Sequence, residues 1–358
     1  MAVKFTKPEI NVREKLAELD KPSGIAGEAM LRAETVAEQQ ALVGVGRRNI
    51  LINGDFQVSQ RGTYTSATAS TSGYFLDRWR VDRNGTATVQ HTSGHDIPGT
   101  PTICKAIKLV QSTTASNYLG IRQLLETPAQ YIGRTFTYSA WVRSNTHNAR
   151  IACYIPGTSP NTYIGPNAHS GSGEWEYLSF TFTLNSGTPT AFHADVFIDN
   201  GAYGNTTITA GEYVEVTMLQ LEFGKVATPF EHRSYGEELA LCQRYFQRLF
   251  SVSVGSAAGI RWQGRIGSIY NGTRCFVTVD LPVTMRVTPT ISYNNSFSWA
   301  MYSANASIGP STQITNVYPT TDSVGFDMHP ASSLASSYHG KAFHADVYAG
   351  SCDASAEL

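Results

Sequence analysis

The sequence predicts a mainly β protein with short N-terminal helices, one internal helix and two β units. Three observations predict this class: apolar and polar residues alternate, turn-forming residues separate the alternating runs, and charged residues are scarce. Charged residues make up 15% of the 358 residues and apolar residues 41%. The formal net charge of -1 gives no electrostatic reason to expect nucleic acid as a partner.

Residues 1 to 48 differ in composition from the rest and predict three short helices. Asn11 can cap the first, and Thr35 with Glu38 forms a capping box for the third. Helices this short are marginal alone, because helix nucleation is costly, so they need a partner surface. We expect a docking segment here, and a frayed polar leader is the alternative.

Residues 49 to 233 predict a β-sandwich of two sheets. In the run from 176 to 184, Leu178, Phe180 and Phe182 share one face, while mainly polar residues share the other. Alternation of this kind directs the apolar side chains into the space between two packed sheets.

A helix is predicted over residues 234 to 250. Ser234 and Glu237 form the capping box that begins it. Four residues then share one face at spacings of three, four and three: Leu239, Cys242, Phe246 and Leu249. We expect this stripe to mediate self-association around a symmetry axis. Packing against the same chain's sandwich is the alternative.

Residues 251 to 358 predict a second β-rich unit, which we place at the distal tip. Its aromatic residues are dense, and Trp299, Tyr302 and Tyr293 are the candidate ligand-binding residues. Aromatic faces stack on sugar rings, and neighbouring amides and hydroxyls can bind the hydroxyl groups of the sugar. The alternative is a small core built from Tyr and Trp.

The constellations of common enzymes are missing from the sequence. His193 and Asp195 stand two apart on a predicted strand, as do His344 and Asp346. Each pair could hold a metal or orient a base, but no third ligand stands at a suitable spacing. We therefore expect structural hydrogen bonds, with no catalytic residue, no metal and no cofactor.

The cysteines and the hydropathy of the chain indicate where it is made. Five scattered residues without a CxxC pair predict free, buried thiols in a reducing cytosol: Cys104, Cys153, Cys242, Cys275 and Cys352. No run of eighteen apolar residues is present, so we expect no membrane insertion.

Two stretches resemble known families. Residues 228 to 246, which begin Thr-Pro-Phe-Glu-His-Arg-Ser-Tyr, look like a junction of bacteriophage tail and fibre proteins. Residues 49 to 56, Asn-Ile-Leu-Ile-Asn-Gly-Asp-Phe, resemble the opening strand of galactose-binding-like jelly rolls of the carbohydrate-binding-module type. Residues 136 to 142 and 214 to 222 follow in the order seen in those jelly rolls.

The jelly-roll resemblance also carries expectations for single residues. Trp79, Trp141 and Trp175 match framework positions, so we expect them in the core. Gln57 stands where many carbohydrate-binding members carry glutamate, which weakens the inference of a calcium site at the first strand.

Together the resemblances imply a structural virion protein, a phage tail fibre that takes part in host attachment through glycan binding, and not an enzyme. They imply a homotrimer in the virion, made in the host cytoplasm. Residues 1 to 48 would dock on another virion protein, and the tip would bind a host cell-surface glycan. A capsid fibre or decoration protein without a receptor role is the alternative, and a polysaccharide depolymerase is a further one.

Overall fold

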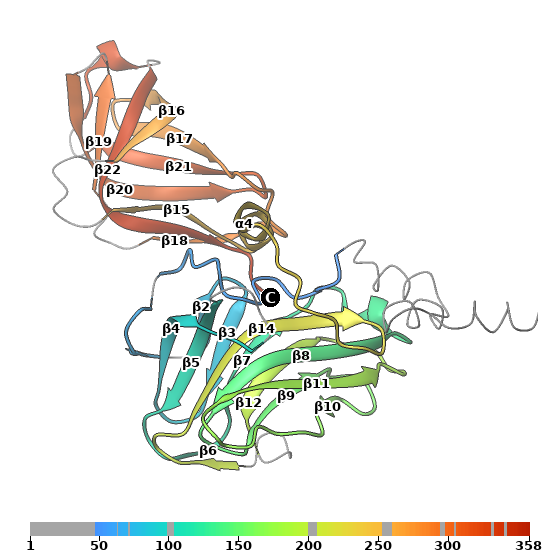
Figure 1. The fold of residues 1–358 in the computed structure, drawn as a ribbon. Helices are drawn as coiled ribbons and strands as arrows, with labels where there is room; N and C mark the ends of the chain where they lie inside the picture. The colour runs from blue at the N-terminus through green and yellow to red at the C-terminus, as the bar shows by residue number, and fades with distance from the viewer. Residues whose placement is uncertain are drawn as a thin grey trace, which may run out of the picture.

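The computed structural model describes residues 47–62, 64–70, 72–98, 104–199, 206–252, 260–293, 298–303, 306–330, 333–339 and 342–358. Two β units are stacked, with one helix and the C-terminus between them (Figure 1). The mainly β class predicted from the sequence is confirmed. The three short helices and almost all of the docking segment fall in residues 1–46, outside the described residues.

The first unit is a jelly-roll β-sandwich of two six-stranded antiparallel sheets. The β14 sheet has the order β1-β4-β5-β14-β8-β11, with strands β1 (Thr68–Ala69), β4 (Ala87–His95), β5 (Cys104–Gln111), β14 (Tyr213–Phe223), β8 (Thr135–Ser144) and β11 (Trp175–Thr183). The β7 sheet has the order β10-β9-β12-β7-β3-β2, with strands β10 (Thr162–Ile164), β9 (Ala149–Tyr154), β12 (His193–Ile198), β7 (Leu119–Leu124), β3 (Trp79–Arg83) and β2 (Gly73–Leu76). A separate pair is formed by β6 (Ala115–Asn117) and β13 (Thr206–Ile208), and the 3-10 turn η1 spans Pro128–Tyr131.

The jelly-roll core lies between the two sheets and follows the predicted alternation. Phe136 and Tyr138 of β8 are fully buried, and Leu178, Phe180 and Phe182 of β11 are at most 8% exposed. The intervening residues of both strands face away from the core. This alternation gives each sheet an inner face and an outer face, and the outer faces are where ligands could bind.

The two stretches that carry the family resemblance lie against each other. Residues 49–56 are a turn-rich segment, not the strand that the resemblance implied. The Glu231 carboxylate accepts hydrogen bonds from the backbone N–H groups of Arg48, at 3.0 Å, and Asn49, at 2.6 Å. Arg233 donates to the carbonyl oxygens of Leu51, at 3.1 Å, and Asn49. The junction motif therefore holds the segment that opens the jelly roll, some 180 residues away in the sequence.

Asn53 and Phe56 complete this arrangement inside the unit. The Asn53 side chain bonds both backbone groups of Val58, at 2.9 Å each, while its own carbonyl accepts from the Trp79 indole at 2.8 Å. Phe56 packs edge-on against Trp79, with ring centroids 5.6 Å apart. Glu238, from the helix, accepts from the Asn53 N–H. These residues thus have structural roles.

The connecting helix is shorter than predicted. Helix α4 spans Tyr235–Gln243 and is followed by strand β15 (Phe246–Val252). The Ser234 half of the predicted capping box is confirmed, because the Ser234 hydroxyl accepts from the Glu237 N–H at 3.3 Å, while the Glu237 carboxylate pairs with Arg47 at 2.7 Å. The predicted continuation to residue 250 is wrong. Strand β15 instead pairs with the last strand of the chain, which satisfies its backbone groups.

The four residues predicted to form a helical stripe are consequently divided between two elements. Leu239 and Cys242 are on α4, where Cys242 is fully buried, and Phe246 and Leu249 are on β15. Phe246 is 2% exposed, and Leu249 packs against the core of the C-terminal unit. They do not form one helical face, and Leu249 packs against the C-terminal unit, not against the sandwich as the alternative expected. Self-association itself stays a prediction.

The second unit is a sheet that closes on itself through its last strand. Its strands are β15, β16 (Ile260–Asn271), β17 (Arg274–Asp280), β18 (Thr290–Tyr293), β19 (Ser298–Ser303), β20 (Ala306–Pro319), β21 (Ser323–Pro330) and β22 (Ala342–Ser355), with the 3-10 turn η2 at Ser336–Tyr338. Strand β22 pairs with β15, β16, β18 and β19. The core of this second unit contains Ile269, Val277, Phe326 and Met328.

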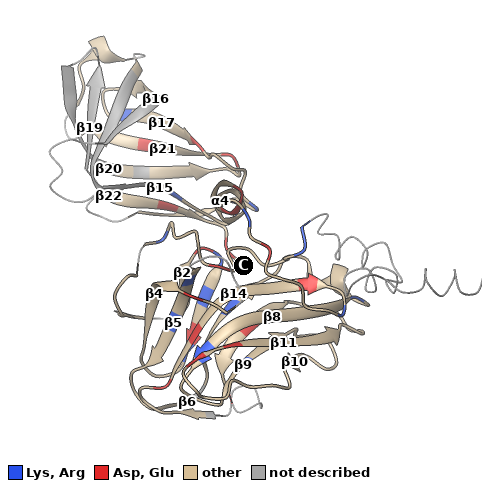
Figure 2. Cartoon of the chain, viewed as in Figure 1, with Lys and Arg blue, Asp and Glu red and all other residues tan. Residues whose placement is uncertain are grey.

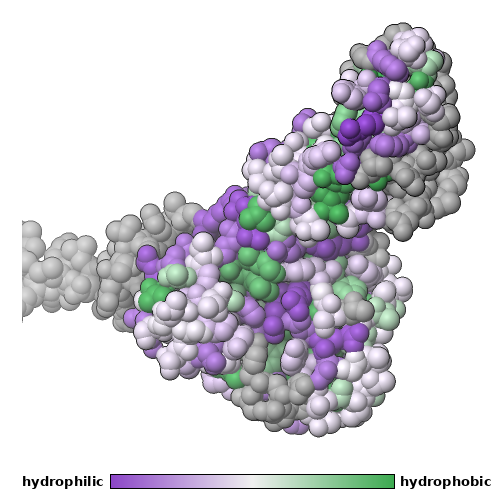
Figure 3. Space-filling view, turned by 180° about the vertical axis from the view of Figure 1, so that it is seen from behind, coloured by the Kyte–Doolittle hydropathy of each residue, from purple (hydrophilic) through white to green (hydrophobic). Residues whose placement is uncertain are grey.

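The C-terminus joins the two units. Glu357 pairs with Arg61, at 3.0 Å, and with Arg78, both from the jelly roll. The Arg78 guanidinium lies 3.6 Å from the ring centroid of Tyr245. Charged residues gather around α4 and the C-terminus (Figure 2), and both hydrophilic and hydrophobic residues lie along the seam between the units (Figure 3). The relative placement of the units therefore depends on buried charge pairs.

The five cysteines are free and buried, as predicted. Burial raises the pKa of the Cys153 and Cys242 thiols well above the usual value, so both stay protonated at neutral pH. In the part of the chain that the structure describes, no helix is long and apolar enough to cross a membrane.

Candidate functional site

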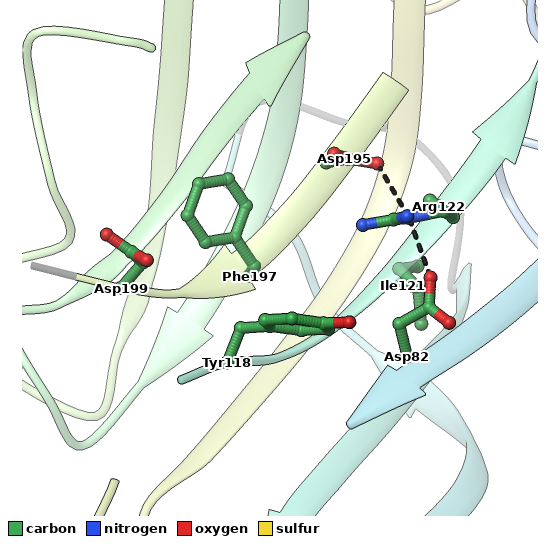
Figure 4. Close-up of a pocket in the computed structure, with 8 residues that line it drawn as sticks. Asp82, Tyr118, Ile121, Arg122, Asp195, Phe197 and Asp199 are labelled. Carbon is green, nitrogen blue, oxygen red and sulfur yellow. Dashed lines mark ion pairs between the residues drawn. The ribbon is translucent and has the colours of Figure 1, made fainter. Parts of the chain in front are cut away.

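The outer face of the β7 sheet carries a cluster of four charged side chains, in which Arg80 of β3 pairs with Asp82, its Nε atom 2.9 Å from Asp82 Oδ1. Arg122 of β7 lies between Asp82 of β3 and Asp195 of β12, with its Nε atom 2.7 Å from Asp82 Oδ2 and 3.3 Å from Asp195 Oδ1 (Figure 4). Both carboxylates are at most 4% exposed. The three strands are neighbours in the sheet, so the cluster links them across the hydrogen-bonded ladder.

This cluster adjoins a cavity, but the cavity is very small. Tyr118, Phe197 and Asp199 line its other side (Figure 4). Its volume is about 10 Å³, which is room for about one water molecule. The Arg122 guanidinium bridges both carboxylates. A sugar ring is too large to enter this cavity. We interpret the cluster as a structural link.

His193 and Asp195, the pair noted in the sequence, share this outer face. The His193 ring packs edge-on against Tyr154, with centroids 5.5 Å apart. Burial, and then the positive charge of Arg122, lowers the pKa of His193 from 6.5 to about 4. The described residues contain no group of three or more His, Cys, Asp or Glu side chains that could hold a metal. The side chains of His344 and Asp346 lie outside the described residues.

The depressed pKa of His193 predicts a loss of stability in mild acid. The unfolded chain takes up the proton near pH 6.5, whereas the folded chain does so only near pH 4. The contribution of neutral His193 to the free energy of unfolding is therefore complete above pH 6.5 and is lost as the pH falls towards 4. We expect wild type to lose about 1–3 kcal/mol more than His193→Gln between pH 7.5 and 4.5, measured by urea unfolding. Equal losses in the two proteins would contradict this assignment.

The outer face of the β14 sheet carries a row of aromatic side chains. Trp141 of β8 lies opposite Tyr177 of β11, with ring centroids 5.4 Å apart, and Trp175 lies two residues before Tyr177 on the same strand. Tyr177 is 44% exposed, and the two tryptophans are half-buried. We call Trp141, Trp175 and Tyr177 the aromatic row.

A buried ion pair supports one end of the aromatic row. Glu215 of β14 is fully buried and accepts from Arg143 Nε at 2.9 Å. The Arg143 guanidinium in turn lies 5.2 Å from the ring centroid of Trp175, and His95 packs edge-on against the same tryptophan at 5.3 Å. Burial lowers the pKa of His95, and the Glu215 carboxylate, 3.1 Å from its Nε2 atom, opposes that shift. Trp175 is thus held from two sides in a fixed orientation.

The arrangement has the chemistry of a sugar-binding surface. Indole and phenol faces stack on the apolar faces of sugar rings, and nearby polar groups bind the hydroxyls. Ser179 lies on the next outward row of β11, beside Tyr177, and is partly exposed, whereas Ser139, opposite it on β8, is only 2% exposed. Arg143 adds a charged donor at the other end. An extended glycan could therefore contact aromatic and polar groups in succession.

The expected core positions of the tryptophans are only partly correct. Trp79 is 2% exposed and lies in the main core, as predicted. Trp141 and Trp175 do not, because their strand positions direct them to the outer face, where they pack beside the small cluster of Ile97, Cys104 and Met218.

The three aromatic residues predicted to bind ligand are not brought into a described site. Tyr293 lies on β18 and is 38% exposed. Trp299 and Tyr302 lie on β19, but their side chains fall outside the described residues. Gln57, which stands where many carbohydrate-binding members carry glutamate, donates a hydrogen bond to the buried Asp55 carboxylate. These positions stay predictions.

No protein-family model matches the sequence, and the comparison with curated proteins gave no match. Among solved structures, the chain is similar to TmCBM61 in complex with β-1,4-galactotriose, at 13% identity and TM-score 0.30, over 50% of this chain and 100% of that one. It is similar to the CBM22-2 xylan-binding domain from Paenibacillus barcinonensis, at 14% identity and TM-score 0.31, over 41% and 92%.

A third similar structure is the enzymatically active domain of tailspike protein 4 from bacteriophage CBA120, at 13% identity and TM-score 0.29, over 49% of this chain and 21% of that one. Identities and TM-scores this low carry no argument about ligand or activity. The functional argument therefore rests on the residues of this chain.

Proposed function

We propose that the protein is a glycan-binding structural component of a phage particle and that the aromatic row contacts the sugar. The observation that carries this proposal is the row itself: two half-buried tryptophans and an exposed tyrosine on the outer face of the β14 sheet, with Trp175 held by Arg143 and His95. Pre-ordered side chains lose little rotamer freedom on binding, which favours affinity.

The placement in a tail fibre rests on the sequence resemblance of residues 228 to 246 and of the jelly roll. In this proposal residues 1 to 48 dock the protein to another virion protein, and several copies present their glycan surfaces together as a homotrimer. Several weak sites on one particle raise the overall avidity without any new contact. A capsid fibre without a receptor role would leave the aromatic row unused, and a depolymerase would cleave the glycan that it binds.

The proposal is tested on an array of bacterial lipopolysaccharides, capsular polysaccharides and plant β-glycans. We expect wild type to bind at least one of them, and Trp175→Ala with Tyr177→Ala to weaken that binding about 10-fold or more, a loss of about 1.4 kcal/mol. Tyr235→Ala is the matched control, because Tyr235 is 55% exposed and lies on α4, away from the row.

Three results would count against the proposal. Wild type that binds no glycan on the array removes the glycan-binding function. Equal binding by the double variant and wild type removes the aromatic row as the site. Shortening of the bound polysaccharide, followed by size-exclusion chromatography, would show a depolymerase instead. Solution mass and electron microscopy of labelled particles test the homotrimer and its attachment point.

A further inference from the structure

A larger cavity lies at the seam between the two units, and we call it the seam pocket. Its volume is about 370 Å³, within the roughly 300–1,000 Å³ of small-molecule sites. The jelly roll supplies most of the lining, and Tyr245, between α4 and β15, adds to it from the other side of the seam. The polar lining includes Arg78, Gln123, Glu126, Thr127, Gln130 and Tyr245.

Arg78 and Tyr245 form a buried part of the pocket wall. They are 1% and 5% exposed, and the guanidinium lies 3.6 Å from the centroid of the tyrosine ring. Arg78 pairs with Glu357 and donates to the Leu124 carbonyl oxygen at 2.6 Å. The Tyr245 carbonyl oxygen accepts from the Ala356 N–H at 2.7 Å. Both units therefore hold this wall in place, and the Arg78 charge already has a carboxylate partner.

Glu126 is the charged lining residue that a ligand can reach. Its side chain is 28% exposed, and its carboxylate pairs with Arg244 at 3.1 Å and with Arg286 at 3.8 Å. Burial opposes its ionisation, but hydrogen bonds from Tyr245 and Arg244 prevail and lower the pKa of Glu126. An anionic ligand would meet this carboxylate as a like charge, and a cationic ligand would compete with two guanidiniums already beside it. The seam pocket therefore favours a neutral ligand.

Thr127 and Gln130 give the pocket a neutral polar rim, because both are exposed. Thr127 has φ 46° and ψ 57°, a left-handed conformation that is unfavourable for a β-branched residue and for a residue before proline. Within the described chain, the Thr127 hydroxyl does not cap the 3-10 turn η1 that follows. Backbone strain of this kind clusters at ligand sites, where the strained residue is held ready for contact. The strain is thus an observation, independent of the cavity, that points to a binding site.

We propose that the seam pocket binds a neutral mono- or disaccharide, whose hydroxyl groups contact Glu126, Thr127 and Gln130. A hydroxyl both donates and accepts, so it can donate to the Glu126 carboxylate and accept from the Gln130 amide. A ligand with several hydroxyls and no charge satisfies both kinds of group at once. Because both units line the pocket, a bound sugar should also raise the temperature at which they unfold together. This site is separate from the aromatic row and does not depend on it.

The test is calorimetric titration of the full chain with glucose, galactose, mannose and N-acetylglucosamine, and with galacturonate as the anionic counterpart of galactose. We expect a neutral sugar to bind, and Thr127→Gly with Gln130→Ala to weaken that binding about 10-fold. Thr127→Gly alone should weaken binding without lowering the free energy of unfolding, because glycine adopts a positive φ without strain. Asn316→Ala is the matched control, since Asn316 is an exposed amide on β20, away from the pocket.

The other outcomes count against the seam pocket. Wild type that binds none of these sugars shows a cavity that holds only water, and it leaves the aromatic row to be decided by the glycan array. Sugar binding that is lost in the Trp175 and Tyr177 variant, but kept in the Thr127 and Gln130 variant, assigns the sugar to the aromatic row. Tighter binding of galacturonate than of galactose contradicts the charge argument.

Discussion

Replacing Glu357 by alanine is expected to lower the free energy of unfolding by about 3–5 kcal/mol. Arg78 is 1% exposed, and Glu357 is the carboxylate paired with it. Removing that carboxylate leaves a buried guanidinium whose charge is not compensated. Arg61 also loses its 3.0 Å contact to the same side chain. We call the contacts of Glu357 with Arg61 and Arg78 the joint between the two units. The single substitution Glu357→Ala should therefore weaken this joint.

Calorimetry measures whether the two units still unfold together. Wild type should unfold in one coupled transition, and Glu357→Ala should separate it into two, because the units no longer stabilise each other. Glu237→Ala is the matched control, since Glu237 pairs with Arg47 at 2.7 Å in an exposed position. Exposed ion pairs contribute about 0–1 kcal/mol, so the control should change little. Equal losses in the two variants would contradict the assigned role of the joint.

The sequence predicted the fold well where local pattern determines structure. The alternation in β11 and the N-cap at Ser234 are both present in the structure. The prediction failed at the end of α4, because the spacing of Phe246 and Leu249 is compatible with a helix as well as with a strand. The choice depends on β22, whose pairing residues lie about 100 positions later. A pairing at that distance leaves no local signal.

The candidate site was missed although part of its signal was present. Phe136, Tyr138 and Ala140 alternate into the core, which places Trp141 on the outer face by its position in β8. The same count places Trp175 and Tyr177 outward on β11. The resemblance to jelly-roll framework positions instead predicts core positions for Trp141 and Trp175. The Arg143–Glu215 pair could not be predicted, because it depends on the register between β8 and β14.

Replacing Gly54 by alanine is expected to cost about 3 kcal/mol or more, near the upper end of single-residue effects. A Cβ atom at this position would lie 2.3 Å from the Leu219 carbonyl oxygen, which is backbone and cannot move aside. That carbonyl lies at the bulge of β14 where Met218 has a φ of 52°. The Gly54 carbonyl also accepts from the Leu219 N–H at 3.0 Å. The two segments approach closely because residue 54 has no side chain.

Gly236→Ala is the matched control, because an added Cβ there meets nothing within 4 Å and the residue lies in the first turn of α4. Alanine in a helix loses less backbone entropy than glycine, so this control should be neutral or slightly stabilising. Urea unfolding of both variants measures the difference. If Gly54→Ala unfolds at the same urea concentration as wild type, residues 49–56 can move away from β14 without loss of stability. The Asn-Gly-Asp-Phe motif would then not be needed to build the jelly roll. If it is destabilised while residual folded protein still binds glycan, the Asn-Gly-Asp-Phe motif is a structural element that builds the jelly roll. The aromatic row would then account for the binding.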